Sequence, residues 1–186
     1  MKYDVRKFGD EILREKTRPV ESVTDEIREL AKDMLETMRV EHGVGLAAPQ
    51  IGRSVALFVM EVPFEYDTDE NGVRFNPEVP MPLVLINPEI TEFSKAKETA
   101  DEGCLSFPGI YVPVARSVEI TVKFIDARGK PQQLHLKKFM ARVIQHESDH
   151  LNGVLLVDRM SRLKRIALSG QLKRLKEETR ERLAVG

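Results

Sequence analysis

The spacing of apolar positions along the chain predicts three amphipathic helices. Across residues 23–41, apolar side chains recur at intervals of three and four, so they share one face of a helix. Thr24 is suited to cap the start of this helix, and Gly43 is suited to end it. The same spacing predicts helices at about residues 138–152 and 162–183. The apolar side of the third helix consists of Leu163, Ile166, Leu168, Leu172 and Leu175.

Short apolar runs bounded by turns predict strands between the helices. Residues 55–60 and 83–87 are continuous apolar runs of the kind found in buried strands, and residues 112–126 are rich in β-forming residues. A Gly-containing turn then leads into a strand at residues 132–136. The segment 62–82 is rich in Pro, Asp, Glu and Asn, which predicts an exposed loop. Helices and strands mix without a regular βαβ alternation, so the expected fold class is α+β.

The composition is that of a single globular domain spanning residues 1–186. The chain is 41% hydrophobic and 32% charged, and no apolar run approaches the ~18 residues of a membrane span. The first residues lack the apolar segment of a secretion signal. The single cysteine excludes an internal disulfide. We therefore expect a cytoplasmic protein with no membrane segment, whose thiol is free for chemistry or metal binding.

Charge is distributed unevenly along the chain. The net charge is −1, but residues 159–186 contain nine Lys or Arg and three Glu, so this tail carries +6 and the remainder −7. A basic tail on an acidic body is typical of a docking site for an anionic partner. A solvated helix rich in Lys and Arg explains the same pattern about equally well.

The strongest chemical signal is the hexapeptide Gln145–His150 (QHESDH), within the second predicted helix. His146 and His150 are four residues apart, so both imidazoles leave one face of a helix and can form half of a tetrahedral metal site. Glu147 lies beside the first histidine and can reach a metal-bound water without being a ligand itself. A chance pair of surface histidines is the alternative, and the H-E-x-x-H pattern disfavours it.

A catalytic metal site also needs a third protein ligand. No His or Cys follows the hexapeptide, and the acidic residues beyond it form no recognisable ligand motif. These acidic residues are Asp158, Glu177, Glu178 and Glu181. Cys104 follows a glycine that permits close backbone approach, and its thiolate would be a strong ligand for Zn²⁺ or Fe²⁺. A lone cysteine is normally a small buried apolar residue, but two histidines in need of a partner favour the ligand. His42 and His135 are not assigned to the metal.

Three segments of the chain resemble the signature motifs of the peptide deformylase family. They are Gly43–Gln50 (GVGLAAPQ), Glu102–Ser106 (EGCLS) and Gln145–His150, in the family's order and at compatible spacing. The resemblance spans essentially the whole chain. It implies an α+β fold with mixed or antiparallel strands packed around a central metal-binding helix, followed by the basic C-terminal helix. It also implies a hydrolase that removes the N-formyl group from the N-terminal methionine of nascent polypeptides during protein biosynthesis.

The resemblance implies that Cys104, His146 and His150 bind one divalent metal ion and that Glu147 is the general acid/base. Fe²⁺ is then the expected native ion, although Zn²⁺, Ni²⁺ and Co²⁺ also suit one thiolate and two imidazoles. Such an ion lowers the pKa of bound water from 15.7 to about 7, and the metal-bound water would attack the formyl carbon. Glu147 would accept the proton and deliver it to the leaving amine.

Further roles follow from the same resemblance. Gln50 and the backbone N–H of Leu105 would stabilise the charge that develops on the formyl oxygen. Gly45 would hold the extended substrate peptide through its own backbone. Glu102 matches the acidic residue that supports a metal ligand, and Arg116 stands where the ionic partner of this acidic residue is expected.

The methionine side chain of the substrate requires an apolar pocket. By alignment to the family, Val44, Val143 and the stem of Arg142 are the candidates, and the last two lie one helical turn before the first histidine. Two features depart from the family's pattern. Ser148 stands where an aliphatic residue is common, and the insertion at residues 66–80 is longer than in short members, which leaves the contacts at the cleft rim unassigned.

Two other functions share part of this pattern. A metalloprotease that cleaves internal peptide bonds would carry the same helix motif, and the upstream Cys104 segment distinguishes the two. A non-catalytic metal-stabilised module docking on ribosomal RNA would need a fourth protein ligand, and no second cysteine exists. In some family members the C-terminal helix is thought to dock on the ribosome. The expected partners are therefore N-formylmethionyl nascent peptides and, through the basic helix, the ribosome.

Overall fold

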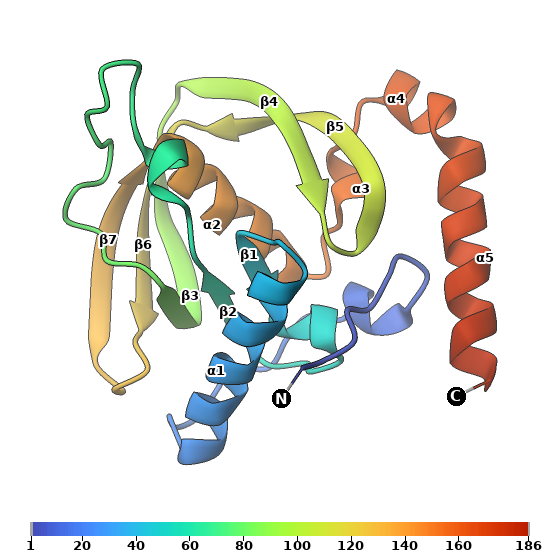
Figure 1. Ribbon diagram of the computed structural model, residues 1–186, viewed down its shortest axis with the longest axis horizontal. Coiled ribbons are helices and arrows are strands. Elements are labelled where there is room, and N and C mark those ends of the chain that lie inside the picture. Colours follow the sequence, from blue (N-terminus) through green and yellow to red (C-terminus); the bar gives the residue numbers. More distant parts are fainter. Residues whose placement is uncertain (1, 186) are drawn as a thin grey trace.

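Two antiparallel sheets form the framework of the fold. A computed structural model describes residues 2–185 of the chain (Figure 1). The larger sheet has the strand order β1-β2-β3-β6-β7, and the smaller sheet is the hairpin β4-β5. The large sheet contains β1 (Gly45–Ala47), β2 (Leu57–Met60), β3 (Leu83–Phe93), β6 (Glu119–Ile125) and β7 (Pro131–Lys137), and the hairpin contains β4 (Lys97–Cys104) and β5 (Phe107–Ser117). All neighbouring strands in both sheets run antiparallel.

The helices cover the sheets, and α2 lies in the centre (Figure 1). The α-helices within residues 2–185 are α1 (Asp25–Val40), α2 (Lys138–Leu151), α3 (Leu156–Arg159), α4 (Arg162–Ala167) and α5 (Ser169–Val185). Three short 3-10 helices join them: η1 (Glu11–Arg14), η2 (Ala48–Ile51) and η3 (Phe64–Asp67). This arrangement confirms the α+β class, with antiparallel strands packed on the helix that carries both candidate histidines. Within the described chain, no helix has the length and apolar character needed to cross a membrane.

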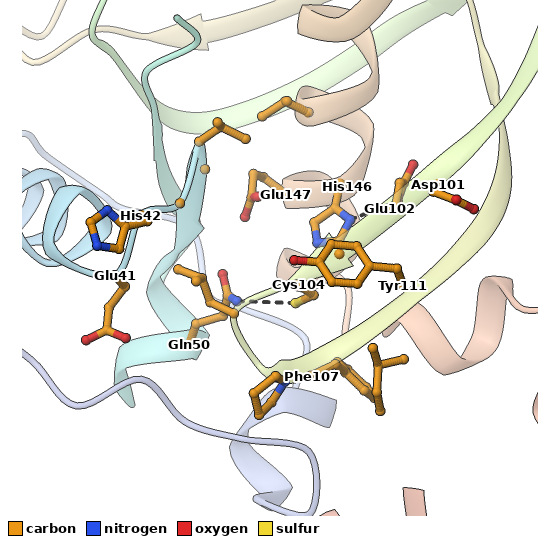
Figure 2. Close-up of a pocket in the computed structure, with 18 of the residues that line it drawn as sticks. Glu41, His42, Gln50, Asp101, Glu102, Cys104, Phe107, Tyr111, His146 and Glu147 are labelled. Carbon is orange, nitrogen blue, oxygen red and sulfur yellow. Dashed lines mark hydrogen bonds and ion pairs between the residues drawn. The ribbon is translucent and has the colours of Figure 1, made fainter. Parts of the chain in front are cut away.

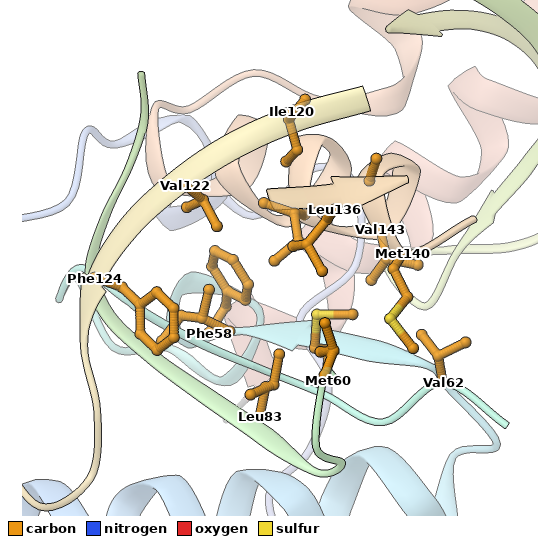
Figure 3. Close-up of a cluster of buried hydrophobic side chains, with 14 of the residues drawn as sticks. Phe58, Met60, Val62, Leu83, Ile120, Val122, Phe124, Leu136, Met140 and Val143 are labelled. Atoms are coloured by element: carbon orange, nitrogen blue, oxygen red, sulfur yellow. The ribbon is translucent and has the colours of Figure 1, made fainter. Parts of the chain in front are cut away.

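Strand β2 is buried on both faces, as its continuous apolar run predicts. Phe58 and Met60 belong to the core cluster that α2 shares with the sheet (Figure 3). Leu57 and Val59 belong to the cluster on the opposite face, which α1 covers. All four side chains are fully buried, and burying a side chain of this kind contributes roughly 1.5–3 kcal/mol. The sheet is therefore held between two helices, which fixes α2 in the interior.

Helix α1 agrees with its predicted start but not with its predicted end. The Thr24 side chain accepts a hydrogen bond from the N–H of Ile27, so the predicted cap is confirmed. At the other end the residue in the left-handed conformation is His42, with φ 57°, and not Gly43. Gly43 instead provides space, because a Cβ there would lie 2.8 Å from Cδ1 of Leu105. The prediction that Gly43 ends the helix was therefore wrong by one residue.

The C-terminal segment forms two helices and not the single helix predicted over residues 162–183. Helix α4 ends before Leu168, and α5 follows directly after it. Leu163 and Ile166 on α4 are 81% and 60% exposed, so placing them on the apolar side was wrong. Leu168 and Leu172 do pack against the apolar cluster beneath the β4–β5 hairpin. The segment is therefore fastened to the body at the break and along α5, while α4 projects its apolar residues into solvent.

Strand β4 was not predicted, because its sequence has no apolar alternation. Of its eight residues only Glu102 is buried. The strand pairs with β5 along one edge and with no other strand among residues 2–185. Pairing with a neighbour therefore forms this strand, and local sequence pattern does not reveal it.

The segment 62–82 is more ordered than the exposed loop that its composition predicts. Asp67 and Asn76 are 1% and 4% exposed. The side-chain amide of Asn76 donates to the carboxylate of Asp67 at 2.6 Å, and Arg74 donates to the same carboxylate at 2.9 Å. Asn76 also exchanges hydrogen bonds with the backbone N–H and C=O of Lys137, at 2.8 and 3.1 Å. These contacts fasten the segment to the start of α2.

Candidate metal centre

Three metal-binding side chains meet where the end of β4 faces α2. Cys104 is the last residue of β4, and His146 and His150 lie one turn apart on α2. One donor atom from each of the three lies within 4.8 Å of the others, and the Cys104 sulfur is 3.3 Å from Nε2 of His150. Figure 2 shows Cys104 and His146 on the same wall of a pocket. The structure therefore brings together the sulfur and the two nitrogens that the sequence selects.

The electrostatics of this cluster favour the thiolate form of the cysteine. Burial alone would raise the pKa of the Cys104 thiol, but the facing imidazoles of His150 and His146 outweigh it and hold that pKa well below its usual value. Burial would likewise lower the pKa of His146, yet hydrogen bonds to Cys104 and Glu102 raise it. Thiophilic divalent cations bind the thiolate form of cysteine and the neutral form of histidine. A cation that binds here would therefore displace the protons that these side chains still carry.

The donor set fits a divalent metal ion, and the rejected candidates lie elsewhere. One sulfur and two imidazole nitrogens suit borderline-soft cations, and three protein ligands leave a position open for substrate or water. No other cluster of this kind occurs among residues 2–185. Asp158 is paired with Arg14 and caps α3 through the N–H of Leu155. His135 is half-exposed beside Glu119 on the sheet surface.

Glu147 is buried in the same pocket and is not held by a partner. The residue is 4% exposed, and its Oε2 has no hydrogen-bond partner within the described chain. Burial raises the pKa of this carboxyl, and the nearby histidines oppose that rise. In Figure 2 the carboxylate points into the pocket between α2 and β1. A buried carboxyl with a raised pKa and a free oxygen is suited to exchange a proton with a reacting molecule.

Gly45 makes room for this carboxylate. A Cβ on Gly45 would lie 2.8 Å from Cδ of Glu147, closer than side chains approach. We predict that Gly45→Ala displaces Glu147 and lowers kcat/KM for the hydrolysis that the resemblance implies by roughly 10²-fold, the cost of about 1 Å of misplacement. Gly170→Ala is the matched control, because a Cβ at Gly170 meets no atom within 4 Å. Equal activities of the two variants would contradict the assigned contact.

Gln50 is oriented with its amide nitrogen toward the candidate ligand. Its Oε1 accepts from the N–H of Ala47 at 2.9 Å, and its Nε2 donates to Ser106 Oγ at 3.1 Å and toward the Cys104 sulfur at 3.6 Å. Figure 2 shows the last contact as a dashed line. The fixed oxygen leaves the N–H₂ group as the part that faces the centre. The carbonyl of Leu105, the next candidate along the chain, accepts from the partly buried ammonium of Lys7 at 2.7 Å.

Glu102 supports one histidine from behind. Its Oε2 lies 2.9 Å from Nδ1 of His146, and Arg116 donates to both carboxylate oxygens at 2.9 and 3.0 Å. Burial would raise the pKa of Glu102, but the hydrogen bonds from His146 and Arg116 outweigh it and lower that pKa. Because the carboxylate can only accept, Nδ1 of His146 donates, which leaves Nε2 free to bind a metal. Glu102 thus contacts both His146 and Arg116, the residue that the resemblance suggests as its ionic partner.

The pocket that Cys104 and His146 line has a volume of about 680 Å³. Val44, Val143 and Arg142, the residues expected to contact methionine, all line it. Sequence reasoning missed four aromatic side chains of the lining, which are Tyr66, Phe107, Tyr111 and Phe139. Tyr66 from η3 lies on Phe139 of α2, with ring centroids 5.2 Å apart. Tyr66 lies within the insertion whose contacts the sequence analysis left unassigned. Its place in the pocket depends on the hydrogen bonds that hold this segment to the start of α2, and these are not visible in the sequence.

Two further details differ from a simple reading of the sequence. The guanidinium of Arg142 is buried against the hairpin and donates to Glu102 Oε1 at 2.8 Å, so only part of this side chain can face the pocket.

Ser148 stands where the resemblance led us to expect an aliphatic residue. Its hydroxyl is a buried oxygen without a hydrogen-bond partner within the described chain. His42 lines the pocket but does not belong to the donor cluster.

The chain is similar to peptide deformylases in family pattern, sequence and structure. The family model described as polypeptide deformylase matches residues 2–166. Peptide deformylase from Thermotoga sp. (strain RQ2) is 45% identical over 170 residues, covering 91% of this chain and 94% of that protein. That from Prochlorococcus marinus (strain AS9601) is 44% identical over 158 residues, 85% of this chain and 73% of that protein. The crystal structure of the Thermus thermophilus peptide deformylase has a TM-score of 0.81 at 41% identity, covering 95% of this chain and 99% of that one.

Proposed function

Because the chain belongs to the peptide deformylase family of hydrolases, we propose that a divalent metal ion held by Cys104, His146 and His150 carries its catalysis. The family's activity is removal of the N-formyl group from nascent peptides. The observation that supports the metal-dependent mechanism is the cluster of those three donors, two of which, Cys104 and His146, line the same pocket as Glu147. The roles assigned to Gln50, Leu105 and the pocket residues are part of the same proposal.

The chain's own groups divide the work of hydrolysis between proton transfer and charge stabilisation. A divalent ion held by the three donors would act as a Lewis acid, which lowers the pKa of bound water to about 7 and polarises a carbonyl. Glu147 accepts the proton of the attacking water and passes it to the amine that leaves, for which its buried position and free oxygen suit it. The closeness of Glu147 to Gly45 supports a proton transfer beside the backbone that we propose holds the peptide.

The negative charge that develops on the formyl oxygen needs fixed donors. Ala47 holds the Gln50 oxygen and Ser106 accepts one hydrogen of its amide, so the hydrogen directed toward Cys104 is the one that Gln50 would donate to the formyl oxygen. The backbone N–H of Leu105 is the second donor, in a peptide segment steadied by the bond from Lys7 to the Leu105 carbonyl. A single donor of this kind is worth about 3 kcal/mol in the transition state. Removing the Gln50 amide should therefore slow the chemical step more than it weakens substrate binding.

We infer that the methionine side chain binds against apolar residues of the pocket. Val44, Val143 and Phe139 are among these residues, and Arg142, whose stem is apolar, also lines the pocket. Gly45 on β1 offers its backbone to an extended peptide, which would lie beside the strand edge. We therefore expect the pocket to bind an unbranched apolar side chain next to the reacting bond, with the rest of the peptide extending toward solvent.

The native metal and a second partner follow from the same resemblance. We expect Fe²⁺ as the native ion, with Zn²⁺, Ni²⁺ and Co²⁺ as functional substitutes, since all suit thiolate and imidazole ligands. We also expect the basic C-terminal region, α4 and α5, to bind ribosomes. This binding should weaken steeply between about 50 and 200 mM salt, as roughly one counterion is released per phosphate contact. Salt-insensitive cosedimentation with ribosomes would contradict this expectation.

The assay that tests the function compares three peptides with different groups on the terminal nitrogen. Formate release from formyl-Met-Ala-Ser is expected, acetyl-Met-Ala-Ser should remain intact, and a longer N-blocked, unformylated peptide should not be cut internally. Activity on formyl peptide alone supports a deformylase. Internal cleavage of the blocked peptide would instead assign the H-E-x-x-H helix to a metalloprotease.

A further inference from the structure

The hairpin that carries the candidate sulfur ligand is not part of the main sheet. Strands β4 and β5 form a separate sheet, and no ladder joins them to the five-stranded sheet within residues 2–185. Figure 1 shows the hairpin arching over α2 at the edge of the molecule. Cys104 therefore lies on one unit, and His146 and His150 lie on another. The distance between the sulfur and the nitrogens depends on what fixes the hairpin to α2.

Side chains from α2 provide much of that connection. Gln145 exchanges hydrogen bonds with the backbone of Ser117, at 3.1 and 2.9 Å, and so fixes the far end of β5. Arg116 of β5 donates to Asp149 of α2 at 2.7 Å. The first contact holds only β5, and the second reaches β4 only through the side chain of Glu102, which Arg116 also binds. The hydrogen bonds from His146 and Lys138 of α2 to β4 likewise end on side chains, of Glu102 and Glu98. None of these contacts reaches the backbone of β4, the strand that ends in the candidate ligand.

Arg142 is the α2 side chain that grips both strands at once. Its guanidinium donates to the backbone carbonyl of Glu98 in β4 at 2.6 Å and to that of Val114 in β5 at 2.8 Å. A third hydrogen bond, also 2.8 Å long, goes to the carboxylate of Glu102, two residues before Cys104. The residue is 8% exposed, so these bonds are shielded from water. A planar fork with five donors suits three acceptors in fixed positions, whereas a lysine ammonium does not.

We propose that Arg142 is a positioning residue, which clamps the Cys104 hairpin onto the helix of His146 and His150 and so sets the geometry of the metal centre. The inference rests on the proposed metal centre. It assigns the guanidinium of Arg142 a role of its own, distinct from the contact between the Arg142 stem and methionine that the sequence resemblance implies. The two roles predict different measurements, because a clamp changes metal binding and a substrate contact changes KM.

The test replaces Arg142 by methionine, which keeps an apolar stem along the pocket and removes all three hydrogen bonds. Glu102 retains Arg116 and His146 as partners, so its charge is not left unpaired. We expect Arg142→Met to weaken Zn²⁺ binding, measured against a competing chelator, by roughly 10- to 100-fold. At saturating metal, KM for formyl-Met-Ala-Ser should change by less than about threefold, since the substrate contact is not what is lost.

A second readout uses the metal-free protein and so does not depend on activity. Amide hydrogen exchange in β4 and β5 should be faster in Arg142→Met than in the wild type, while exchange in α1 and β2 stays unchanged. Arg142→Lys should recover only part of the metal affinity, because it restores the charge without the fork. Arg39→Met is the matched control, since Arg39 makes a paired hydrogen bond to Glu61 on the exposed surface, away from the hairpin.

Several results would overturn the clamp. If Arg142→Met leaves Zn²⁺ affinity unchanged and raises KM, the role of Arg142 is contact with the substrate and not positioning of the metal ligands. Full recovery by Arg142→Lys would show that charge alone matters, and uniformly faster exchange across the whole chain would show general destabilisation. Failure of the proposed function is a separate outcome: the wild type would release no formate from formyl-Met-Ala-Ser, whether or not Arg142→Met weakens Zn²⁺ binding.

Discussion

Glu147→Gln is expected to lower kcat for formate release by a factor of roughly 10²–10⁴, the usual contribution of a positioned general acid/base. The glutamine side chain has nearly the same shape as Glu147, so the packing beside Gly45 is retained. What is lost is the group that accepts a proton from water and returns it to the leaving amine. Steady-state formate release, measured with saturating substrate at neutral pH, gives the effect directly.

The metal content of the Glu147→Gln variant is the control. Glu147 is not one of the three donors, so the variant should bind one metal ion per chain with the affinity of the wild type. A variant that has lost its metal would place Glu147 among the ligands and not in proton transfer. A variant that keeps both metal and full activity would remove Glu147 from the mechanism.

Cys104→Ser is expected to weaken metal binding by more than about a hundredfold, since even outer groups that support a ligand contribute 10- to 100-fold. The thiolate is replaced by a hydroxyl that stays protonated at neutral pH and is a poor ligand for a thiophilic ion. The two histidines remain, so residual weak binding is expected. Titration against a coloured chelator, with metal content measured after dialysis, tests this expectation.

The matched comparison for Cys104→Ser is the metal-free wild type. Both proteins should have the same circular dichroism spectrum, because Cys104 contributes only at the margin of the cluster beneath the hairpin. Unchanged metal stoichiometry and affinity in the variant would reject Cys104 as a ligand. The metal would then have to be held by the two histidines with a donor not yet assigned.

Elements with strong local signals were predictable from the sequence. The helix that became α2 was visible because its apolar spacing and its two histidines at i and i+4 both depend on neighbouring residues alone. Strand β2 was visible because burial on both faces leaves a continuous apolar run. From the residues alone Cys104 could be selected by elimination, as the one thiol available to complete a site with His146 and His150, and the family resemblance of residues 102–106 implies the same ligand.

Features that depend on distant contacts were not predictable. Strand β4 is exposed along most of its length and exists through its pairing with β5. Tyr66 reaches the pocket because Asp67 and Asn76 fasten the segment 62–82 to the start of α2, and composition alone assigned that segment to solvent. The guanidinium of Arg142 turns away from the pocket toward the hairpin for the same reason: its partners are remote in sequence.

The most direct test of the metal centre is a titration of metal-free protein with Fe²⁺ under anaerobic conditions, with formate release from formyl-Met-Ala-Ser measured at each step. The account predicts almost no activity without metal, a linear rise and a sharp break at one ion per chain. Cys104→Ser should show no such break over the same range. Full formate release by the metal-free wild type, or a break at two ions per chain, would contradict a single ion bound by Cys104, His146 and His150.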